Sequence, residues 1–424
     1  MHDLRMVREH IEVLRDGMRR RGKLDTLGTF IDDAQRADVD RRGLIQAVEE
    51  RKASRNAITQ EVAKRKRAGT DATELLDQSR ALGEEISRLE SELATLEEQL
   101  EHALFELPNV TLSDVPEGGE EQNQHVRSWG TPRESGSVKP HWEVGVSLGL
   151  IDFERGAKIS GSGFIVFRGV GAKLVRSLMN FMLDLHTTQH HYEEVWVPIV
   201  VGRAAMTGTG QLPKFEDDMY GVEGESMFLI PTAEVPVTNL HAGEILAESD
   251  LPRAMTAYTP CFRKEAGAHG KDTRGLIRVH EFDKVELVRY TTPESSVDEL
   301  EVLTLQAEKV LQLLGLPYRV TLLAAGDTGF SSAKTYDLEV FAPGAGAWLE
   351  VSSCSSFTDF QARRANIRYR PADGGKPRFV HTLNGSGVAF PRVIAAILEH
   401  YQNADGTIEV PEVLRPYLGT DRLG

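Results

Sequence analysis

The sequence predicts an α+β protein in which a long antiparallel helical hairpin precedes a domain built on a mainly antiparallel β-sheet flanked by helices. The chain has 424 residues, too many for one compact core. A heptad pattern runs through the first quarter, and short strand-like and helix-like segments alternate after about residue 141. Hydrophobic residues make up 40% and charged residues 27%, which excludes wholesale disorder.

The hairpin is predicted from apolar residues that recur at steps of three and four, the spacing of a coiled-coil seam. They are Ile86, Leu89, Leu93, Leu96, Leu100, Ala103 and Leu107. Residues 44–66 supply a weaker partner seam, because Arg51 and Arg55 stand where apolar residues are expected. Gly69 marks the tip. We therefore expect an N-terminal arm over residues 1–107, with short amphipathic helices over 1–40 and a hairpin over about 41–107.

The charges on this arm are unevenly distributed. Residues 41–67 hold nine Lys or Arg and three Glu, a net charge of +6, whereas residues 84–106 hold one Arg and eight Glu, a net charge of −7. One interpretation is a surface for a phosphate backbone, and the other is pairing of opposite charges between the helices. The basic tip slightly favours RNA. The candidate RNA-binding residues are Arg51, Arg55, Lys64, Arg65, Lys66 and Arg67.

Residues 108–141 are rich in Pro, Gly, Ser and Glu and are predicted to be a linker, followed by an α+β sheet domain over 142–424. Strands are expected over 195–201, interrupted by Pro198, over 279–290 and over 347–353. The sequence contains neither a G-x-G-x-x-G nor a G-x-x-x-x-G-K-S/T motif. Any ATP is therefore expected to bind without a Rossmann or P-loop site.

Composition also limits the class of protein. No apolar run is long enough for a membrane helix, and the charged N-terminus does not resemble a signal peptide. The two cysteines, Cys261 and Cys354, do not have metal-ligand spacing, so no zinc is expected. A cytoplasmic location follows as the default expectation. The net charge of −15 argues against a protein that coats nucleic acid, so an RNA partner would need a local basic surface.

Three segments of the second half carry a specific pattern. Residues 174–190 and the segment with Pro198 form a helix followed by a strand, and Phe262-Arg263-Lys264-Glu265 begins a pair of strands that returns through residues 276–286. Residues 384–392, Asn-Gly-Ser-Gly-Val-Ala-Phe-Pro-Arg, open a helix. In this order the segments resemble the three motifs of class II aminoacyl-tRNA synthetases.

Five further short segments resemble signatures of the seryl-tRNA synthetase family, and the resemblance extends over nearly the whole chain. They are Thr-Gly-Gln-Leu-Pro at 209–213, Pro-Thr-Ala-Glu-Val at 231–235, Arg-Gly-Leu-Ile-Arg-Val-His at 274–280, Glu-Val-Ser-Ser-Cys-Ser at 350–355 and Asp-Phe-Gln-Ala-Arg-Arg at 359–364. The resemblance implies a serine–tRNA ligase, which forms seryl-adenylate from L-serine and ATP and transfers the seryl group to the 3′ end of tRNA(Ser), possibly also tRNA(Sec).

The resemblance also assigns residues. The catalytic residues would be Arg263, Glu265 and Arg392. ATP would contact Arg263, Lys264, Glu265, Val279, Phe282, Glu350, Val351, Ser352, Ser353 and Arg392. Phe282 would stack on adenine in a sandwich with Arg392, which would also hold the γ-phosphate end. Mg²⁺ would be held with ATP by Glu350 and Ser353.

Serine would be bound by Thr232, Ala233, Glu234, Arg263, Glu286, Asn384 and Ser386. The partners would be tRNA(Ser), through the arm, and a second copy of the chain, through the motif around Pro198. Glu281 and Ser356 depart from the residues frequent in the family, Gln and Asn, which leaves fine tuning of the site open.

Two alternative functions remain at this stage. A related enzyme could load serine or another amino acid onto a carrier protein, although such relatives tend to lack the arm. A non-catalytic coiled-coil protein would not need Arg263, Glu265, Glu350 and Arg392, all of which are present.

Overall fold

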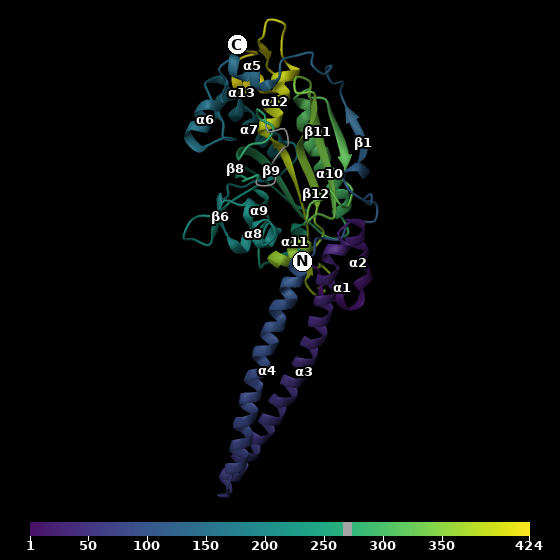
Figure 1. The fold of residues 1–424 in the computed structure, drawn as a ribbon, viewed down its shortest axis with the longest axis vertical. Coiled ribbons are helices and arrows are strands. Elements are labelled where there is room, and N and C mark those ends of the chain that lie inside the picture. The colour runs from purple at the N-terminus through teal and green to yellow at the C-terminus, as the bar shows by residue number, and fades with distance from the viewer. Residues whose placement is uncertain (266–273) are drawn as a thin grey trace. The chain divides into compact units, whose positions relative to one another are not determined.

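The computed structural model describes residues 1–265 and 274–424, which form two compact units, Met1–Pro108 and Asn109–Gly424. The first unit contains the helices α1 (Leu4–Glu9), α2 (Ile11–Arg20), α3 (Leu24–Arg67) and α4 (Thr73–Glu106). Helices α3 and α4 run side by side as a hairpin (Figure 1). Among the described residues, no helix combines the length and apolar character needed to cross a membrane.

The hairpin is longer than predicted, because α3 begins at Leu24 rather than near residue 41. Gly22 has a φ of +66° and separates α2 from α3. From Leu24 onward Ile31 and Ala34 are buried and continue the apolar stripe. Charged residues surround that stripe and obscure its period in the sequence. Residues 24–40 therefore belong to the long helix, and only α1 and α2 are the short helices that were expected.

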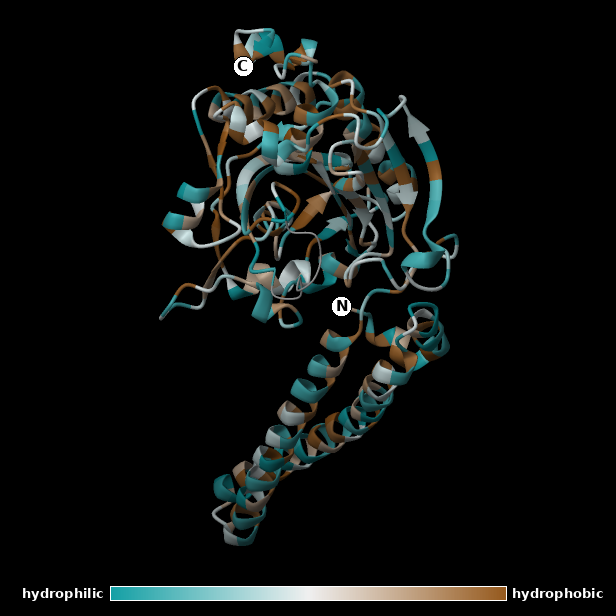
Figure 2. Cartoon of the chain, turned by 45° about the horizontal axis from the view of Figure 1, so that its top comes forward, coloured by the Kyte–Doolittle hydropathy of each residue, from teal (hydrophilic) through white to brown (hydrophobic). Residues whose placement is uncertain are grey.

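The predicted seam packs between the two helices. Ile86, Leu89, Leu100, Ala103 and Leu107 are buried. Along both helices, apolar residues alternate with polar ones, as Figure 2 shows in brown and teal. This amphipathic pattern stabilises the pair by removing apolar surface from water.

Ion pairs connect the stems of α3 and α4. Arg41 approaches Glu97 at 2.8 Å, Arg51 approaches Glu85 at 3.0 Å, and Lys52 approaches Glu90 at 2.7 Å. The Arg55 guanidinium lies over Gly83, 3.4 Å from where a Cβ would be. Pairing of opposite charges therefore accounts for the basic residues of the stem, whereas Lys64, Arg65, Lys66 and Arg67 are exposed at the end of α3.

The second unit is built on an eight-stranded sheet of order β1-β10-β11-β12-β15-β9-β8-β4. All neighbours are antiparallel except β4 and β8, so the predicted fold class is confirmed. The strands of this sheet are β1 (Gln124–Trp129), β4 (Glu193–Glu194), β8 (Arg253–Phe262), β9 (Glu281–Thr291), β10 (Tyr318–Leu322), β11 (Lys334–Ala342), β12 (Ala347–Ser356) and β15 (His381–Ala389).

Three helices, which are labelled in Figure 1, belong to this unit with the sheet. They supply apolar side chains to its main core. They are α7 (Val170–Thr188), α10 (Ser296–Leu313) and α12 (Phe390–His400). Leu178, Leu303 and Ile397 are among the fully buried residues of this core. Polar residues that alternate with the core residues along the central strands line two clefts, which are described below.

Smaller elements complete the unit. The helices are α5 (His141–Ser147), α6 (Phe153–Ser160), α8 (Arg203–Thr209), α9 (Glu234–Thr238), α11 (Phe360–Ala365) and α13 (Arg415–Leu418). The 3₁₀ helices are Glu120–Gln122, Glu216–Asp218, Glu248–Asp250 and Glu412–Leu414. The short strands are β2 (Ile151–Asp152), β3 (Val166–Phe167), β5 (Val200–Gly202), β6 (Met227–Leu229), β7 (Ile245–Ala247), β13 (Arg368–Arg370), β14 (Arg378–Phe379), β16 (Ile408–Glu409) and β17 (Arg422–Leu423).

Three segments differ from the prediction. The expected linker over 108–141 contains β1, which pairs with β10 as an edge strand of the sheet. Of the strand expected over 195–201, only the last two residues belong to a strand, β5; β4 ends before residue 195, and Pro198 lies between β4 and β5. Proline has no N–H to donate to a strand neighbour, which explains the interruption. The strand expected from residue 276 begins only at Glu281, after an irregular stretch.

The seam of the arm predicts a stability difference between two leucines of α4. Leu100 is 4% exposed, whereas Leu76 is 45% exposed. Leu100→Ala should reduce the opening free energy of α3 and α4 by about 2–3 kcal/mol, and Leu76→Ala by less than about 0.5 kcal/mol. Hydrogen exchange of the α3 and α4 peptides in the full chain measures both changes. Equal effects in the two variants would contradict the seam.

Candidate active site

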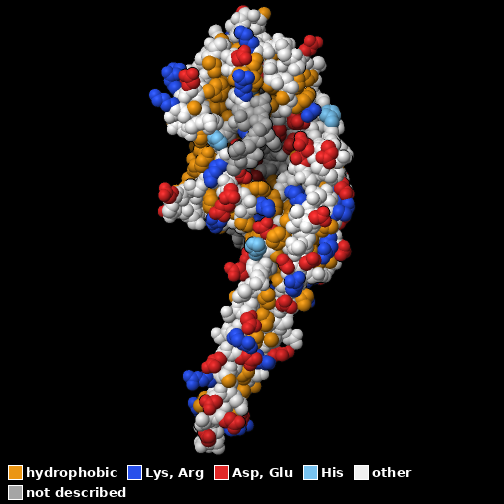
Figure 3. Space-filling view, in the orientation of Figure 1, with side chains coloured by type: hydrophobic (Ala, Val, Ile, Leu, Met, Phe, Trp, Pro, Cys, Tyr) orange, Lys and Arg blue, Asp and Glu red, His pale blue; other side chains and the backbone are white. Residues whose placement is uncertain are grey.

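Two adjoining clefts lie on the polar side of the sheet and share Glu350. Acidic side chains are visible around the hollow of this unit in Figure 3. The first cleft is lined by Arg263, Glu265, Leu276, Ile277, Arg278, Val279, Phe282, Lys284, Glu350, Val351, Ser386, Ala389, Pro391 and Arg392. The second and third predicted motifs and strand β12, far apart in the chain, therefore meet in one cavity.

Arg392 connects the parts of this cavity. It is the third residue of α12, after Pro391, which is well suited to a first helical turn. Its Nε donates to the carbonyl of Ile277 at 2.9 Å, and its NH1 donates to the carbonyl of Glu350 at 2.6 Å. The Glu350 carboxylate lies 3.5 Å from the same NH1. A positive group is thus fixed at the N-terminal turn of a helix, which suits an anion.

The glycines that precede Arg392 were predicted to open the helix, but they lie in a strand. Gly385 and Gly387 lie within β15 and do not open α12. A Cβ on Gly385 would overlap Leu303, and a Cβ on Gly387 would come within 3.0 Å of His186 Nε2. These glycines therefore allow β15 to pack closely against its neighbours.

Arg263 follows the end of β8, and its guanidinium carbon lies 5.2 Å from the centre of the Phe282 ring. Its Nε donates to the carbonyl of Pro231 at 3.3 Å. Arg392 and Phe282 line the same cleft, so the sandwich of adenine between these two side chains stays a prediction. Glu265, the next predicted residue, forms an ion pair with Arg278.

Lys264 and Ser352 do not line either cleft. Lys264 is exposed, and its backbone N–H donates to the carbonyl of Asp218 at 3.1 Å. Ser352 is buried, and its hydroxyl donates to the carbonyl of Ser386 at 2.6 Å. Side chains alternate across a strand, so Ser353, the next residue, lines the second cleft instead. The loop predicted within the second motif, residues 266–273, lies outside the described residues.

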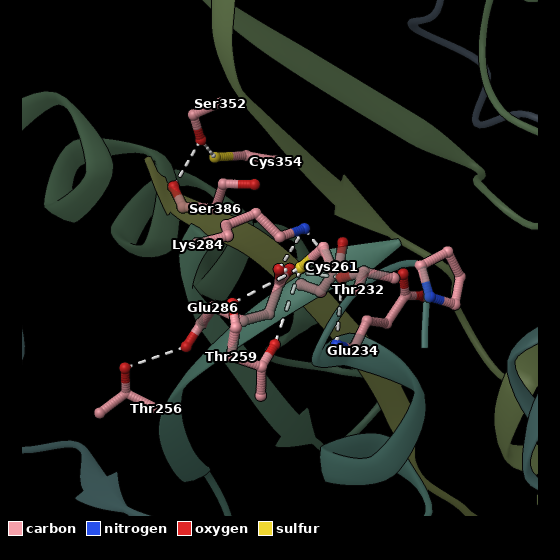
Figure 4. Close-up of polar contacts among 12 residues, drawn as sticks. Thr232, Glu234, Thr256, Thr259, Cys261, Lys284, Glu286, Ser352, Cys354 and Ser386 are labelled. Carbon is pink, nitrogen blue, oxygen red and sulfur yellow. Dashed lines mark hydrogen bonds and ion pairs between the residues drawn. The ribbon is translucent and has the colours of Figure 1, made fainter. Parts of the chain in front are cut away.

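The residues predicted to bind serine form a buried network at the end of the first cleft. The Thr232 hydroxyl donates to Glu286 Oε2 at 3.0 Å, and Asn384 Nδ2 donates to Glu286 Oε1 at 3.2 Å. Lys284 Nζ lies 2.5 Å from Glu286 and donates to Thr232 Oγ1 at 2.8 Å. Figure 4 shows Thr232, Lys284 and Glu286 pointing toward one another.

Glu234 lies beside this network and accepts a hydrogen bond from Gln361 Nε2 at 2.6 Å. Burial, and then the nearby Glu286 carboxylate, raise the pKa of Glu234 to about 7. A carboxylate with this pKa loses its proton readily when a cation arrives. Ala233, in contrast, contributes its side chain to an apolar core cluster, so it can face a ligand only through its backbone.

Sequence reasoning missed Lys284, Gln361 and Arg278. Phe282, Lys284 and Glu286 alternate along β9 and therefore share one face of the sheet. That spacing could have added Lys284 to the site. No local pattern indicates that Gln361, at the start of α11, contacts Glu234, because tertiary packing brings the two together.

The cleft offers few direct metal ligands. Over residues 1–265 and 274–424, no group of three or more His, Cys, Asp or Glu side chains is arranged to hold a metal ion. Glu350 and Ser353 both line the second cleft, so their two oxygens can face a common cation. Mg²⁺ commonly uses one or two protein oxygens together with substrate phosphates, so this pair fits a metal delivered with a nucleotide.

Comparison with known proteins identifies the same two regions. The family model of the seryl-tRNA synthetase N-terminal domain matches residues 1–111, and that of the class II tRNA synthetase core domain (G, H, P, S and T) matches residues 214–401. A serine–tRNA ligase of Gemmatimonas aurantiaca is 63% identical over 420 residues, 99% of each chain. One of Citrifermentans bemidjiense is 52% identical over 421 residues, again 99% of each chain.

Solved structures agree with these relatives. The crystal structure of seryl-tRNA synthetase from Pyrococcus horikoshii complexed with ATP matches with a TM-score of 0.93 and 38% identity, over 100% of this chain and 99% of that one. A cytoplasmic serine–tRNA ligase from Naegleria fowleri in complex with AMP matches with a TM-score of 0.88 and 29% identity, over 100% and 98%. The resemblance found in the sequence is therefore confirmed: the chain belongs to the seryl-tRNA synthetase family.

Proposed function

We propose that this chain activates L-serine with ATP and transfers the seryl group to the 3′ end of tRNA(Ser). The observation that carries the proposal is the meeting of Arg263, Glu350 and Arg392 in one cleft beside the buried network of Glu234 and Glu286. In the first step a serine carboxylate oxygen attacks the α-phosphorus of ATP, and diphosphate leaves. In the second step a ribose hydroxyl attacks the acyl carbon, and AMP leaves.

The nucleotide half of the site supports charge stabilisation and alignment. Arg263 can donate a planar fork of N–H groups to both the serine carboxylate and the α-phosphate. Phe282 offers an apolar face to adenine, and Glu265 can accept from its exocyclic amine, while Val279 and Val351 line the same cavity. Arg392 is directed to the far phosphates. These groups accelerate the reaction mainly by orientation and electrostatics.

Glu350 and Ser353 are the residues that would hold Mg²⁺ with the nucleotide. The bound metal would neutralise charge on the phosphates. The rest of the charge stabilisation comes from the chain's own guanidinium groups.

The acidic network suits serine as the substrate. Glu234, with Thr232, would bind the ammonium group, and Glu286 would accept from the side-chain hydroxyl with help from Asn384 and Ser386. A substrate without that hydroxyl gives up a hydrogen bond to the buried Glu286 carboxylate, which is costly, so alanine would be rejected. Threonine would be excluded by the size of the pocket.

The remaining assignments concern partners. The exposed basic side chains at the tip, residues 64–67, would contact the tRNA backbone. The arm over residues 1–107 would then be the tRNA-binding domain. Two copies would pair through the segment around Pro198, where Trp196 is 82% exposed next to the edge strand β4. We also place the enzyme in the cytoplasm, with an arm that ends near residue 107.

The first prediction concerns Arg263. Arg263→Ala should reduce serine-dependent ATP–diphosphate exchange by about 10³-fold or more, because the developing charge loses its donor. Arg415→Ala is the matched control, since Arg415 pairs with Glu409 away from the cleft and should exchange normally. Near-normal exchange in folded Arg263→Ala would defeat the assignment.

The second prediction concerns pH. Because Glu234 must be charged to bind an ammonium, affinity for serine should rise as pH increases through about 7. The KM for serine, measured between about pH 6 and pH 8, should show this dependence in the native chain and lose it in Glu234→Gln. Glu308→Gln, a change at a buried glutamate that pairs with Arg127, should retain it.

Glu234 should also affect stability with a defined sign. Its folded pKa of about 7 lies above its ordinary value of 4.5, so its contribution to the unfolding free energy is fully present below pH 4.5 and is lost as pH rises to 7. Urea unfolding of the native chain and Glu234→Gln measures the difference. A difference that grows as the pH falls from 4.5 would contradict this account.

The third prediction separates the arm from the chemistry. Reversal of two tip charges, Lys66→Glu with Arg67→Glu, should weaken tRNA charging about tenfold or more at low salt and leave diphosphate exchange unchanged. Arg88→Glu, an exposed change on α4, is the matched control and should charge tRNA nearly normally. Equal loss of charging and exchange in a folded protein would argue against a tRNA-binding tip.

A further inference from the structure

A buried histidine and glutamate lie behind the nucleotide cleft, and the proposed chemistry does not use them. His141 is the first residue of α5, and Glu399 is near the end of α12. Both are 0% exposed. His141 Nδ1 lies 2.8 Å from Glu399 Oε1, and the backbone N–H of His141 donates to the same oxygen at 2.8 Å.

The other imidazole nitrogen of His141 is directed at the cleft wall. The backbone N–H of Leu276 donates to His141 Nε2 at 3.0 Å. Because Nε2 accepts, Nδ1 must carry the proton and donate to Glu399, which fixes a neutral imidazole in one tautomer. The glutamate therefore sets the direction in which His141 can accept a hydrogen bond.

The turn at residues 274–276, which His141 contacts, has a glycine where a side chain would collide with the imidazole. Gly275 has a φ of +68°, which favours glycine, and a Cβ at this position would overlap His141 Nε2. Trp142, the next residue of α5, adds a second contact, because the Arg274 guanidinium carbon lies 5.2 Å from the centre of its ring. The start of α5 thus supports residues 274–276 at two points.

The supported turn leads directly into the nucleotide cleft. Leu276 and Ile277 line the cleft, and the Ile277 carbonyl accepts from Arg392 Nε at 2.9 Å. Arg392 and Glu399 both belong to α12. Helix α12 therefore supports residues 276 and 277 in two ways. Arg392 bonds directly to Ile277, and Glu399 acts through His141.

Glu399 reaches a third part of the site as well. Its Oε2 accepts from the backbone N–H groups of Gly344, at 2.8 Å, and Ala345, at 3.2 Å, in the turn between β11 and β12. Strand β12 carries Glu350, whose carbonyl accepts from Arg392. The two oxygens of Glu399 therefore accept from four N–H groups, which fixes the position of this side chain.

We propose that His141, oriented by Glu399, is a positioning residue of the nucleotide site, which holds Leu276 and Ile277 so that the cleft fits ATP. This inference rests on the proposed function, since it assigns ATP to the cleft. His141 touches no reacting atom, and its effect is expected in the affinity for ATP and not in the serine subsite or the chemical step.

Two conservative variants separate the two hydrogen bonds of the imidazole. His141→Asn can keep a donor for Glu399 but leaves the N–H of Leu276 without an acceptor. His141→Gln can place an amide oxygen near the position of Nε2 and so keeps an acceptor for Leu276. His400→Gln is the matched control, because His400 lies on α12 beside Glu399 but pairs with the carbonyl of Phe341 at 2.8 Å.

The experiment measures ATP binding by titration calorimetry, and the KM for ATP, the KM for serine and kcat by diphosphate exchange, all in the full chain. His141→Asn should raise the Kd and KM for ATP about tenfold, with the KM for serine and kcat within about twofold of the native values. His141→Gln should restore ATP affinity to within about threefold, although both variants lose stability. His400→Gln should bind ATP normally.

The outcomes are distinguishable from failure of the proposed function. If the native chain does not bind ATP, the proposed function fails first. If the native chain binds ATP and folded His141→Asn binds it equally well, or if His141→Asn, His141→Gln and His400→Gln all shift alike, the positioning role is overturned. Should His141→Asn not fold, Gly275→Ala probes the same contact from the turn, and an unchanged KM for ATP in that variant also overturns the role.

Discussion

Arg392 is the side chain on which the arrangement of the site depends. Its guanidinium donates to the carbonyls of Ile277 and Glu350, so it joins the return segment of the second motif, strand β12 and the start of α12. The rest of α12 is buried among the apolar residues of the core. Packing of this helix therefore fixes the position of a charge in the cleft, and the core and the site cannot vary independently.

The second constraint is the balance of buried charge. Glu286 is 1% exposed, Glu234 is 8% exposed and Lys284 is 5% exposed, within one network of hydrogen bonds. One ammonium cannot neutralise two carboxylates, and burial together with Glu286 raises the pKa of Glu234 to about 7. The pocket is thus short of one cation, and an amino-acid ammonium supplies a group of that charge.

Much of the fold follows from local patterns, and the errors have identifiable causes. The seam of α4 was predicted because Leu89 and Leu100 stand at heptad spacing without interruption, whereas the start of α3 was missed because charged residues flank Ile31 and Ala34. The strand β1 was read as a linker, because an edge strand with mostly exposed side chains shows no buried face. Loss of the strand around Pro198 is a backbone effect of proline.

Some residues of the site could also be predicted from the sequence, and others could not. Arg263, Glu350 and Arg392 stand in motifs whose order was recognised in the sequence, and they do line one cleft. Ser352 was included because it belongs to the same motif, but strand alternation turns it into the core and leaves Ser353 facing the second cleft. His141 and Gln361 contact residues more than a hundred positions away, so no spacing in the sequence indicates them.

The stem and the tip of the arm differ in how their basic side chains are paired. This difference explains how an acidic chain could contact RNA. In the stem, Arg51 and Lys52 are opposite Glu85 and Glu90, so their fields largely cancel at a distance. At the tip, the bases of residues 64–67 lie beyond the acidic segment of α4, and the nearest acid with which they pair is Glu61. A positive surface is therefore confined to the end of the hairpin. The net charge of −15 disfavours broad coating of the rest of the chain by nucleic acid.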